Sequence, residues 1–185
     1  MAGIQIDGVN NKIDFDDDAD TSISSASDDT LVVEVGGNTL ATVTATSVTV
    51  NDGVEITTAD NSDTLTLIST DADANTGPNL KLTRNSSSPA DGDVTGEISF
   101  VAENDNDEAI TYSQISSRID DASDGTEDGR LFFYTMVGGS STERLRFNGT
   151  ETAFNEGSAN LDFRVESDSN DHFFIIDASA NRAGS

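Results

Sequence analysis

The stretch Thr95-Gly96-Glu97-Ile98-Ser99-Phe100-Val101-Ala102-Glu103 alternates between two sets of side chains. One set, which points one way, is Gly96, Ile98, Phe100 and Ala102. Such a period of two predicts a half-buried strand. The preceding residues 84–93 contain Ser88-Pro89, which disfavours helix, and Asp91-Gly92, which suits a tight turn. We therefore expect residues 84–93 to be the loop that leads into this strand.

Strand-like sequence continues on both sides of a second acidic turn, residues 120–129. The region 63–147 is therefore predicted to be an antiparallel meander. Upstream, an alternating run ends at Gly36-Gly37, which we interpret as a hairpin turn, because no lysine or helix pattern of a phosphate loop follows it. The fold class predicted for the chain is all-β: an elongated, fibre-like series of short antiparallel strands in meander or sandwich-like modules.

Two stretches, about 100 residues apart, match each other. Val35-Gly36-Gly37-Asn38 corresponds to Val137-Gly138-Gly139-Ser140, and Val50-Asn51-Asp52-Gly53 to Phe154-Asn155-Glu156-Gly157, with two residues inserted in the second copy. Repetition of a unit that cannot bury itself alone is how elongated proteins are built. The predicted divisions are an extended N-terminal segment (1–30), a first β repeat (31–62), a central β module (63–148) and a C-terminal β repeat (149–185).

The chain is poor in residues that form cores. Leu, Ile, Val and Phe together make up 42 of 185 residues, only just above the range typical of disorder, although they are patterned as strands are. A chain of this composition buries too little apolar surface by itself. Oligomerisation would supply the missing burial.

The net charge of -26 arises from 35 acidic and 9 basic residues. Nucleic-acid binding requires a basic surface, so we expect no nucleic acid partner. The acidity suits a solvated surface that keeps particles apart by repulsion. The chain has no cysteine for disulfides or thiolate metal sites, and no apolar run near the roughly 20 residues of a membrane span. No membrane insertion is expected.

Two acidic loops are candidate ion sites. The first has alternating aspartates, namely Asp14, Asp16, Asp18 and Asp20. A calcium loop of the EF-hand type would need glycine at Ala19 and glutamate at Ser25, and has neither. The second loop, residues 120–128, is interpreted as a glycine turn between strands. We predict no metal in either loop and expect removal of divalent ions to leave the fold intact.

Catalysis finds little support in the sequence. The one histidine, His172, lies beside Phe173-Phe174, where a solvent-facing strand residue is expected, and no nucleophile motif pairs with it. Pairs of carboxylates can cleave glycans, but 35 acidic residues produce such pairs by chance, and no tryptophan is present to stack on sugars. We predict a protein that is not an enzyme, with no catalytic, cofactor-binding or metal-binding residues and no cofactor.

Two strand-like runs are apolar on both faces: Leu131-Phe132-Phe133-Tyr134-Thr135-Met136-Val137 and Phe173-Phe174-Ile175-Ile176. Strands of this kind must be covered twice. The same chain can supply one cover, and a neighbouring copy is the expected second one. By contrast, the run 161–166 is apolar on one side only, and its charged residues Asp162, Arg164 and Glu166 can pair in a row on the other.

Several short motifs occur along the central region, namely Gly77-Pro78, Ser88-Pro89-Ala90-Asp91-Gly92-Asp93, Gly96-Glu97-Ile98, Asp124-Gly125-Thr126-Glu127-Asp128-Gly129 and Glu143-Arg144-Leu145-Arg146. This series resembles a module of bacteriophage tail-fibre and other virion fibre proteins. Residues 6–23 resemble the opening of such proteins from aquatic phages. Residues 154–167 and 176–178 are similar to a fibre repeat of the same family.

The resemblance implies a non-enzymatic virion structural protein, a tail fibre or fibre-like appendage that is anchored by its N-terminal segment and contributes to host adsorption. It further implies a homotrimer, tail or capsid proteins as partners, and a place in the virion after assembly in the host cytoplasm. One alternative is a capsid decoration or head-fibre protein built from the same modules. The other is an adhesin that binds, or cleaves, a host-surface glycan.

Overall fold

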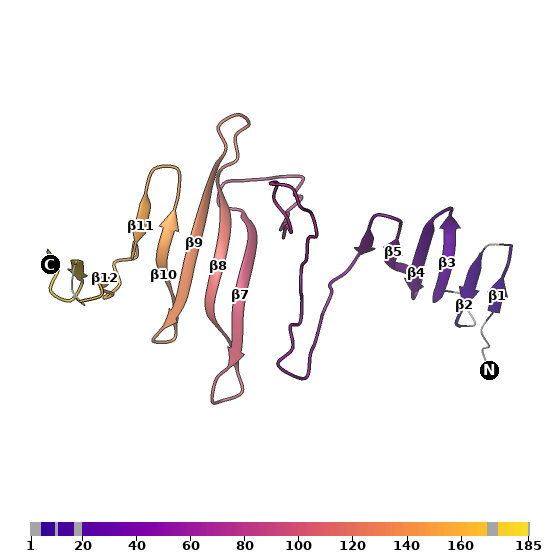
Figure 1. The fold of residues 1–185 in the computed structure, drawn as a ribbon, viewed down its shortest axis with the longest axis horizontal. Coiled ribbons are helices and arrows are strands. Elements are labelled where there is room, and N and C mark those ends of the chain that lie inside the picture. The colour runs from indigo at the N-terminus through magenta and orange to yellow at the C-terminus, as the bar shows by residue number, and fades with distance from the viewer. Residues whose placement is uncertain (1–4, 10, 17–19, 170–173, 185) are drawn as a thin grey trace. The chain divides into compact units, whose positions relative to one another are not determined.

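The computed structural model describes residues 5–9, 11–16, 20–169 and 174–184. Within them all regular structure is β-strand, in three antiparallel sheets, which confirms the predicted fold class (Figure 1). The chain forms two compact units, Met1–Pro78 and Asn79–Ser185, which are described separately. Asp18 and His172, both weighed as candidate site residues, lie outside the described residues.

The first unit contains a six-stranded sheet in sequence order. Its strands are β1 (Gln5–Asp7), β2 (Lys12–Asp14), β3 (Ser22–Ser27), β4 (Thr30–Val35), β5 (Asn38–Val43) and β6 (Val48–Val50). The hairpin predicted at Gly36-Gly37 joins β4 to β5, and both glycines have positive φ. That backbone is costly for other residues and is typical of two-residue hairpin turns.

The expected separation between residues 30 and 31 is absent, because β3 pairs with β4 across that boundary. The turn at Asp28-Asp29 makes this possible, since Asp29 takes a left-handed backbone (φ 59°) that aspartate tolerates better than most residues. Ile23 in β3 lies opposite Val33 in β4, so pairing extends an apolar row. The described part of segment 1–30 is thus part of the sheet and no detached arm.

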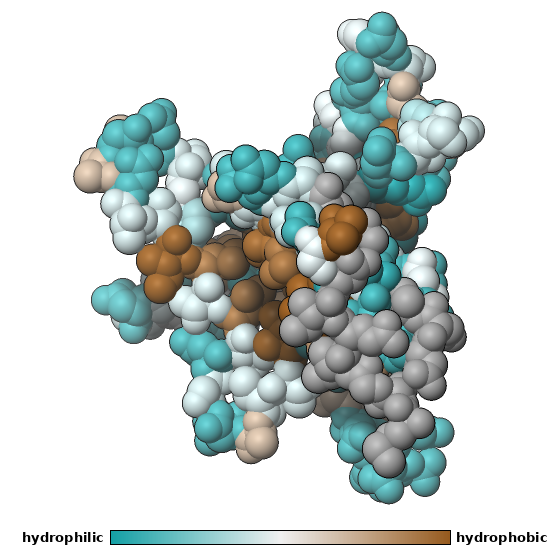
Figure 2. All heavy atoms as spheres, turned by 90° about the vertical axis from the view of Figure 1, so that its right-hand side faces the viewer, coloured by the Kyte–Doolittle hydropathy of each residue, from teal (hydrophilic) through white to brown (hydrophobic). Residues whose placement is uncertain are grey.

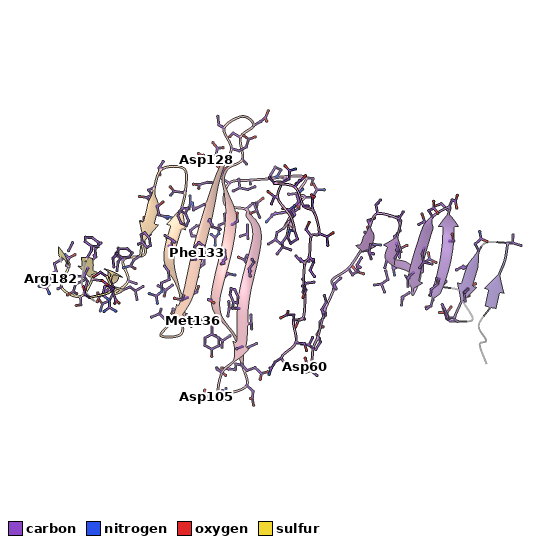
Figure 3. The ribbon with its side chains drawn as sticks, in the orientation of Figure 1. Asp60, Asp105, Asp128, Phe133, Met136 and Arg182 are labelled. Carbon is purple, nitrogen blue, oxygen red and sulfur yellow. The ribbon has the colours of Figure 1, made fainter. Side chains whose placement is uncertain are left out.

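The second unit contains a five-stranded meander in the order β11-β10-β9-β8-β7. Its strands are β7 (Val94–Glu103), β8 (Ala109–Asp121), β9 (Asp128–Val137), β10 (Ser140–Phe147) and β11 (Thr152–Phe154). Residues 84–93 form the loop before β7, and the acidic turn separates β8 from β9, as predicted. Phe133 lies midway along this sheet, between Asp128 near one end and Asp105 at the other (Figure 3).

A three-stranded sheet completes the second unit, with β12 (Phe163–Val165), β13 (Phe174–Asp177) and β14 (Arg182–Gly184). The predicted pairing of charges beside β12 is found in part. The guanidinium of Arg164 lies 2.6 Å from the Glu166 carboxylate. The Asp162 carboxylate instead accepts the backbone N–H of Ala178 at 2.9 Å.

The two matched stretches of the sequence adopt the same local structure. Ala41 pairs with Val50 between β5 and β6, as Leu145 pairs with Phe154 between β10 and β11. The short turn after β5 is closed by Thr44 N–H donating to Ser47 C=O (2.9 Å), and that after β10 by Asn148 N–H donating to Glu151 C=O (3.1 Å). In both turns the side-chain oxygen of the first residue also accepts backbone N–H groups. Thr44 and Asn148 therefore both stabilise their turn with a side-chain oxygen, a hydroxyl in Thr44 and an amide oxygen in Asn148.

Each copy also has a β-bulge at the equivalent place. Leu40 is the extra residue between β4 and β5, and Arg144 the extra residue between β10 and β9. The carbonyl of each bulged residue accepts the backbone N–H of the asparagine that follows the last strand, Asn51 at 3.0 Å and Asn155 at 3.1 Å. The second copy is thus β9 to β11 of the central sheet, not the segment 149–185 that we expected to hold it.

Each sheet is a single layer, because its strands contact mainly their neighbours in the same sheet. Among the described residues, Phe132 is the one buried large apolar side chain, at 3% exposure. Residues 51–93 contain no strand although they are all described. Apolar side chains that are exposed on the open faces of these sheets are therefore the candidate sites of interaction.

Candidate interaction surface

One row of apolar residues crosses the whole five-stranded sheet. Paired positions on neighbouring strands share a face, and this row consists of Ile98, Ile115, Phe133, Leu145 and Phe154. The parallel rows on the same side add six large apolar residues, with Gly, Ala, Ser and Thr at the other paired positions: Phe100, Ile110, Ile119, Leu131, Val137 and Phe147. No charged residue occupies a paired position of these rows, and the one arginine that reaches this side is the bulged Arg144, whose guanidinium donates to the Thr135 hydroxyl at 2.5 Å. We call this side the apolar face.

The apolar face is open to water in the single chain. Phe100 and Phe154 are each 54% exposed, whereas Phe133 in the centre is half-buried by its neighbours. Small residues leave a hollow of about 310 Å³ beside Leu131 and Phe147, lined in part by Ser117 and Gly129. A surface with both protruding rings and hollows suits a closely packed partner.

Aromatic contacts carry the apolar face into the three-stranded sheet. The rings of Phe133 and Phe147 meet edge to face, 6.3 Å apart. The ring of Phe154 lies 4.7 Å from that of Phe163, which in turn lies 6.2 Å from that of Phe174. Within the second unit the two sheets therefore present one continuous apolar strip.

The six-stranded sheet repeats the same design. Its central row is Ile13, Ile23, Val33, Ala41 and Val50. Val33, Ala41 and Val50 occupy the places that Phe133, Leu145 and Phe154 occupy in the second copy. Figure 2 views the molecule from the side of the first sheet. Hydrophobic residues gather in the middle of this view, and hydrophilic residues lie around them.

The opposite face of the five-stranded sheet is polar, apart from Phe132 and its neighbours. The guanidinium carbons of Arg118 and Arg130 lie 5.0 and 5.7 Å from the centre of the Phe132 ring. The Tyr134 ring stacks beside it at 5.4 Å. The same chain therefore supplies one of the two covers expected for β9, because the side chains of Arg118 and Arg130 cover Phe132 by cation–π contact. The second cover, over the Phe133 side, stays a prediction.

Ion pairs occupy the rest of this polar face. The Arg146 guanidinium lies 2.8 Å from Glu156 and 3.2 Å from Glu151. Burial acts to lower the pKa of Arg146, but the hydrogen bond and charge of Glu156 outweigh it, so the pKa is raised. The polar face of the first sheet is organised alike, with Lys12 2.9 Å from Asp14 and the Ser22 hydroxyl donating to Glu34 at 2.9 Å.

Several described carboxylates of the two candidate ion loops are bound by protein groups. The Asp16 carboxylate accepts the Thr21 N–H at 3.3 Å, and hydrogen bonding from Thr21 lowers the pKa of Asp16. In the second loop, Asp120 pairs with Arg130, and the Asp121 carboxylate accepts the Ser123 N–H at 2.9 Å. Among the described residues, no three acidic or histidine side chains come together as a metal would require.

The role of Arg118 and Arg130 is the feature that the sequence reasoning missed. A usable signal existed, because Arg130 precedes Phe132 by two positions and so shares its side of the strand. Which residue of β8 would lie opposite depended on the register, which pairs Arg118 with Arg130. Alternation within one strand shows which residues share a face, but the residue that lies opposite on the next strand is known only from the structure.

No family model, curated protein or solved structure matches this chain. The part of the chain that the structure describes contains no helix able to span a membrane.

Proposed function

We propose that this chain is a non-enzymatic structural subunit of a bacteriophage virion, a tail fibre or fibre-like appendage, in which copies of the chain associate through their apolar faces. The observation that carries the association of copies is the apolar face of the central sheet, whose paired positions hold no charged residue in a chain with net charge -26. Soluble monomers rarely expose a large contiguous apolar surface, and such a surface usually marks a site of interaction. A second copy offers the same face and needs no other partner.

The exposure of single side chains supports association. On the apolar face, Ile98 is 42% exposed, Phe147 is 40% exposed, and Phe100 and Phe154 are each 54% exposed. Removing such side chains from water is favourable, so a second copy that covers the face is stabilised by their burial.

A closed ring of three chains would turn the apolar faces inward and the ion-paired polar faces outward. Closure matters because a head-to-tail contact that fails to close would polymerise. Two sheets placed face to face would also bury the apolar rows, and the number three comes from the resemblance to virion fibres. Measuring the mass of the assembly decides between these arrangements.

The test uses light scattering on the purified chain and two variants. Phe133→Asp adds a charge to the centre of the apolar face, and Ser99→Asp adds the same charge to the exposed polar face of the same sheet. We expect a mass of three chains for the wild type and for Ser99→Asp, and dissociation for Phe133→Asp. A stable wild-type monomer, or an unchanged Phe133→Asp assembly, would show that the apolar face is open to water.

The virion role has its own test. Antibodies against the purified chain, imaged on particles of a phage that encodes it, are expected to bind an appendage of the particle. Binding at the tail supports a tail fibre, and binding over the capsid supports the decoration or head-fibre alternative. Particles without any bound antibody contradict the virion proposal but leave the association through apolar faces standing.

A further inference from the structure

Between β6 and β7 in the sequence, three short segments have the alternating pattern of strands but pair with no strand. They are residues 54–58, 64–69 and 80–84, which we call the unpaired limbs. Each has apolar residues two positions apart, in the order Val54 and Ile56, Leu65 and Leu67, Leu80 and Leu82. Threonine and β-branched residues are frequent in them, as is typical of strands.

The turns between the limbs are formed by specific hydrogen bonds. The Asp60 carboxylate accepts the Ser62 N–H at 2.9 Å, in the turn labelled in Figure 3. The hydroxyls of Thr58 and Thr64 meet across the base of that turn at 3.1 Å. Between the second and third limbs, the Asp73 carboxylate accepts the Asn75 N–H at 2.7 Å. The chain therefore reverses direction at defined places, as it does between paired strands.

The limbs themselves lack what strands normally have. Among the described residues, no hydrogen bond between backbone groups joins a limb to any other part of the chain. The third limb is held by a side chain, because the Arg84 guanidinium donates to the Val94 C=O at 3.2 Å and lies 3.0 Å from the Asp93 carboxylate. Their large apolar side chains are 46% to 77% exposed. Extended backbone with alternating apolar side chains gains a hydrogen-bond ladder and apolar burial together when another strand pairs with it.

The third limb also touches the apolar face. A Cβ added at Gly96 would lie 3.0 Å from the Cβ of Leu82, so glycine at this position allows Leu82 to lie against β7. Gly96 is in the row that includes Ser117 and Leu131, on the apolar face. A molecule that covers the apolar face therefore also meets this limb.

We infer that the unpaired limbs are strands of a sheet formed between copies of this chain, in which each limb pairs with limbs of the neighbouring copies. The inference rests on the proposed association of copies and adds where their backbones join. In copies related by closed symmetry, the same limb of each copy meets its counterparts. Their alternating patterns match, so no separate complementary sequence is needed. The limbs would then connect the apolar interfaces of the two units by interchain hydrogen bonds.

Hydrogen exchange measured by mass spectrometry on the assembled full chain tests this. Amides of the limb 64–69 are expected to exchange at least about tenfold more slowly than those of the turns 59–63 and 70–76. In the Phe133→Asp chain, if it is monomeric, that protection is expected to disappear. Limbs that exchange as fast as the turns within a proven oligomer would overturn the inference and leave the proposed association intact. Protection that persists in a monomer would overturn it too, because pairing would then lie within one chain.

A pair of proline variants gives a second readout. Thr66→Pro removes a backbone donor in the middle of a limb, whereas Asn61→Pro places proline in the turn. We expect Thr66→Pro to lower the melting temperature of the assembly and to abolish protection of residues 64–69, and Asn61→Pro to change neither. Equal behaviour of the two variants contradicts pairing at the limb. A wild-type chain that is monomeric, with limbs unprotected, would overturn both the inference and the proposed association.

Discussion

At the scale of single residues, Phe132 is the position on which the second unit depends most. Its ring is almost fully buried beneath Arg118 and Arg130. Phe132→Ala is therefore expected to lower the free energy of unfolding by about 3 kcal/mol, through lost burial and an unfilled space. The measurement is urea unfolding of dilute, dissociated chain.

The matched control for that prediction is Phe100→Ala, because the Phe100 ring is 54% exposed. Its removal from the dissociated chain is expected to cost less than about 1 kcal/mol. At higher concentration Phe100→Ala should weaken association, since the ring lies on the apolar face. Equal losses of stability for the two variants in dilute solution would contradict the cover that we assign to the arginines.

Tyr134 offers a test of the same environment by pH. Burial raises the pKa of its hydroxyl above the ordinary value of 10.0, with the charge of Arg118 acting in the opposite direction. Above pH 10 the unfolded chain releases this proton before the folded chain does, so stability should fall as pH rises towards the folded pKa. Tyr112→Phe leaves Tyr134 as the remaining tyrosine, and its tyrosinate absorbance can be titrated directly. A folded-state midpoint at or below the unfolded one would contradict the burial.

At the scale of elements, the glycine hairpins set the register of both repeats. Gly138 and Gly139 have φ of 54° and 81°, a region that other residues adopt with strain. Gly139→Ala is expected to lower stability by about 1 kcal/mol. The control is Gly157→Ala, where an added Cβ meets nothing within 4 Å and φ is not positive. Thermal unfolding compares the two, and an equal change in melting temperature would speak against strain at the hairpin.

Alternation predicted the strands well where one face is apolar. Ile98 and Phe100 in β7, and Val33 and Val35 in β4, lie on strands that occur where the period of two placed them. The bulges at Leu40 and Arg144 were not predictable, because a bulge depends on two strands and leaves the pattern of each one unchanged. The unpaired limbs show the converse, since their alternation is strand-like but no strand of the same chain pairs with them.

At the scale of the whole molecule, charge opposes the association that the apolar faces favour. Each chain has a net charge of -26, so copies repel one another. Raising the salt concentration from about 0.01 to 0.15 M shortens the screening length from about 30 to 8 Å. We therefore expect association to become tighter with salt, as measured by sedimentation at several chain concentrations.

The opposite response to salt would carry a different meaning. Association that weakens as salt rises would indicate ion pairs between copies in place of apolar contact. The shortage of core-forming residues could be read from the sequence, and it predicted association with partners, whereas the acidity predicted repulsion between copies. The sequence could not show that Arg118, Arg130 and Arg146 lie on one face of the central sheet, because they come from three different strands.

The two hairpins also differ in length in an instructive way. Val33 and Phe133 are equivalent, yet β4 continues for two residues to its glycine turn and β9 for four, so each strand of the second hairpin is longer by two. An even increment leaves every later side chain on its original face, whereas an odd one would turn the apolar row outward. A hairpin of this sheet can thus be lengthened at its tip in steps of two residues per strand, about 6.6 Å, while every other residue keeps its face. Adding residues in pairs to each strand of a hairpin is therefore a way to change the size of the subunit by design.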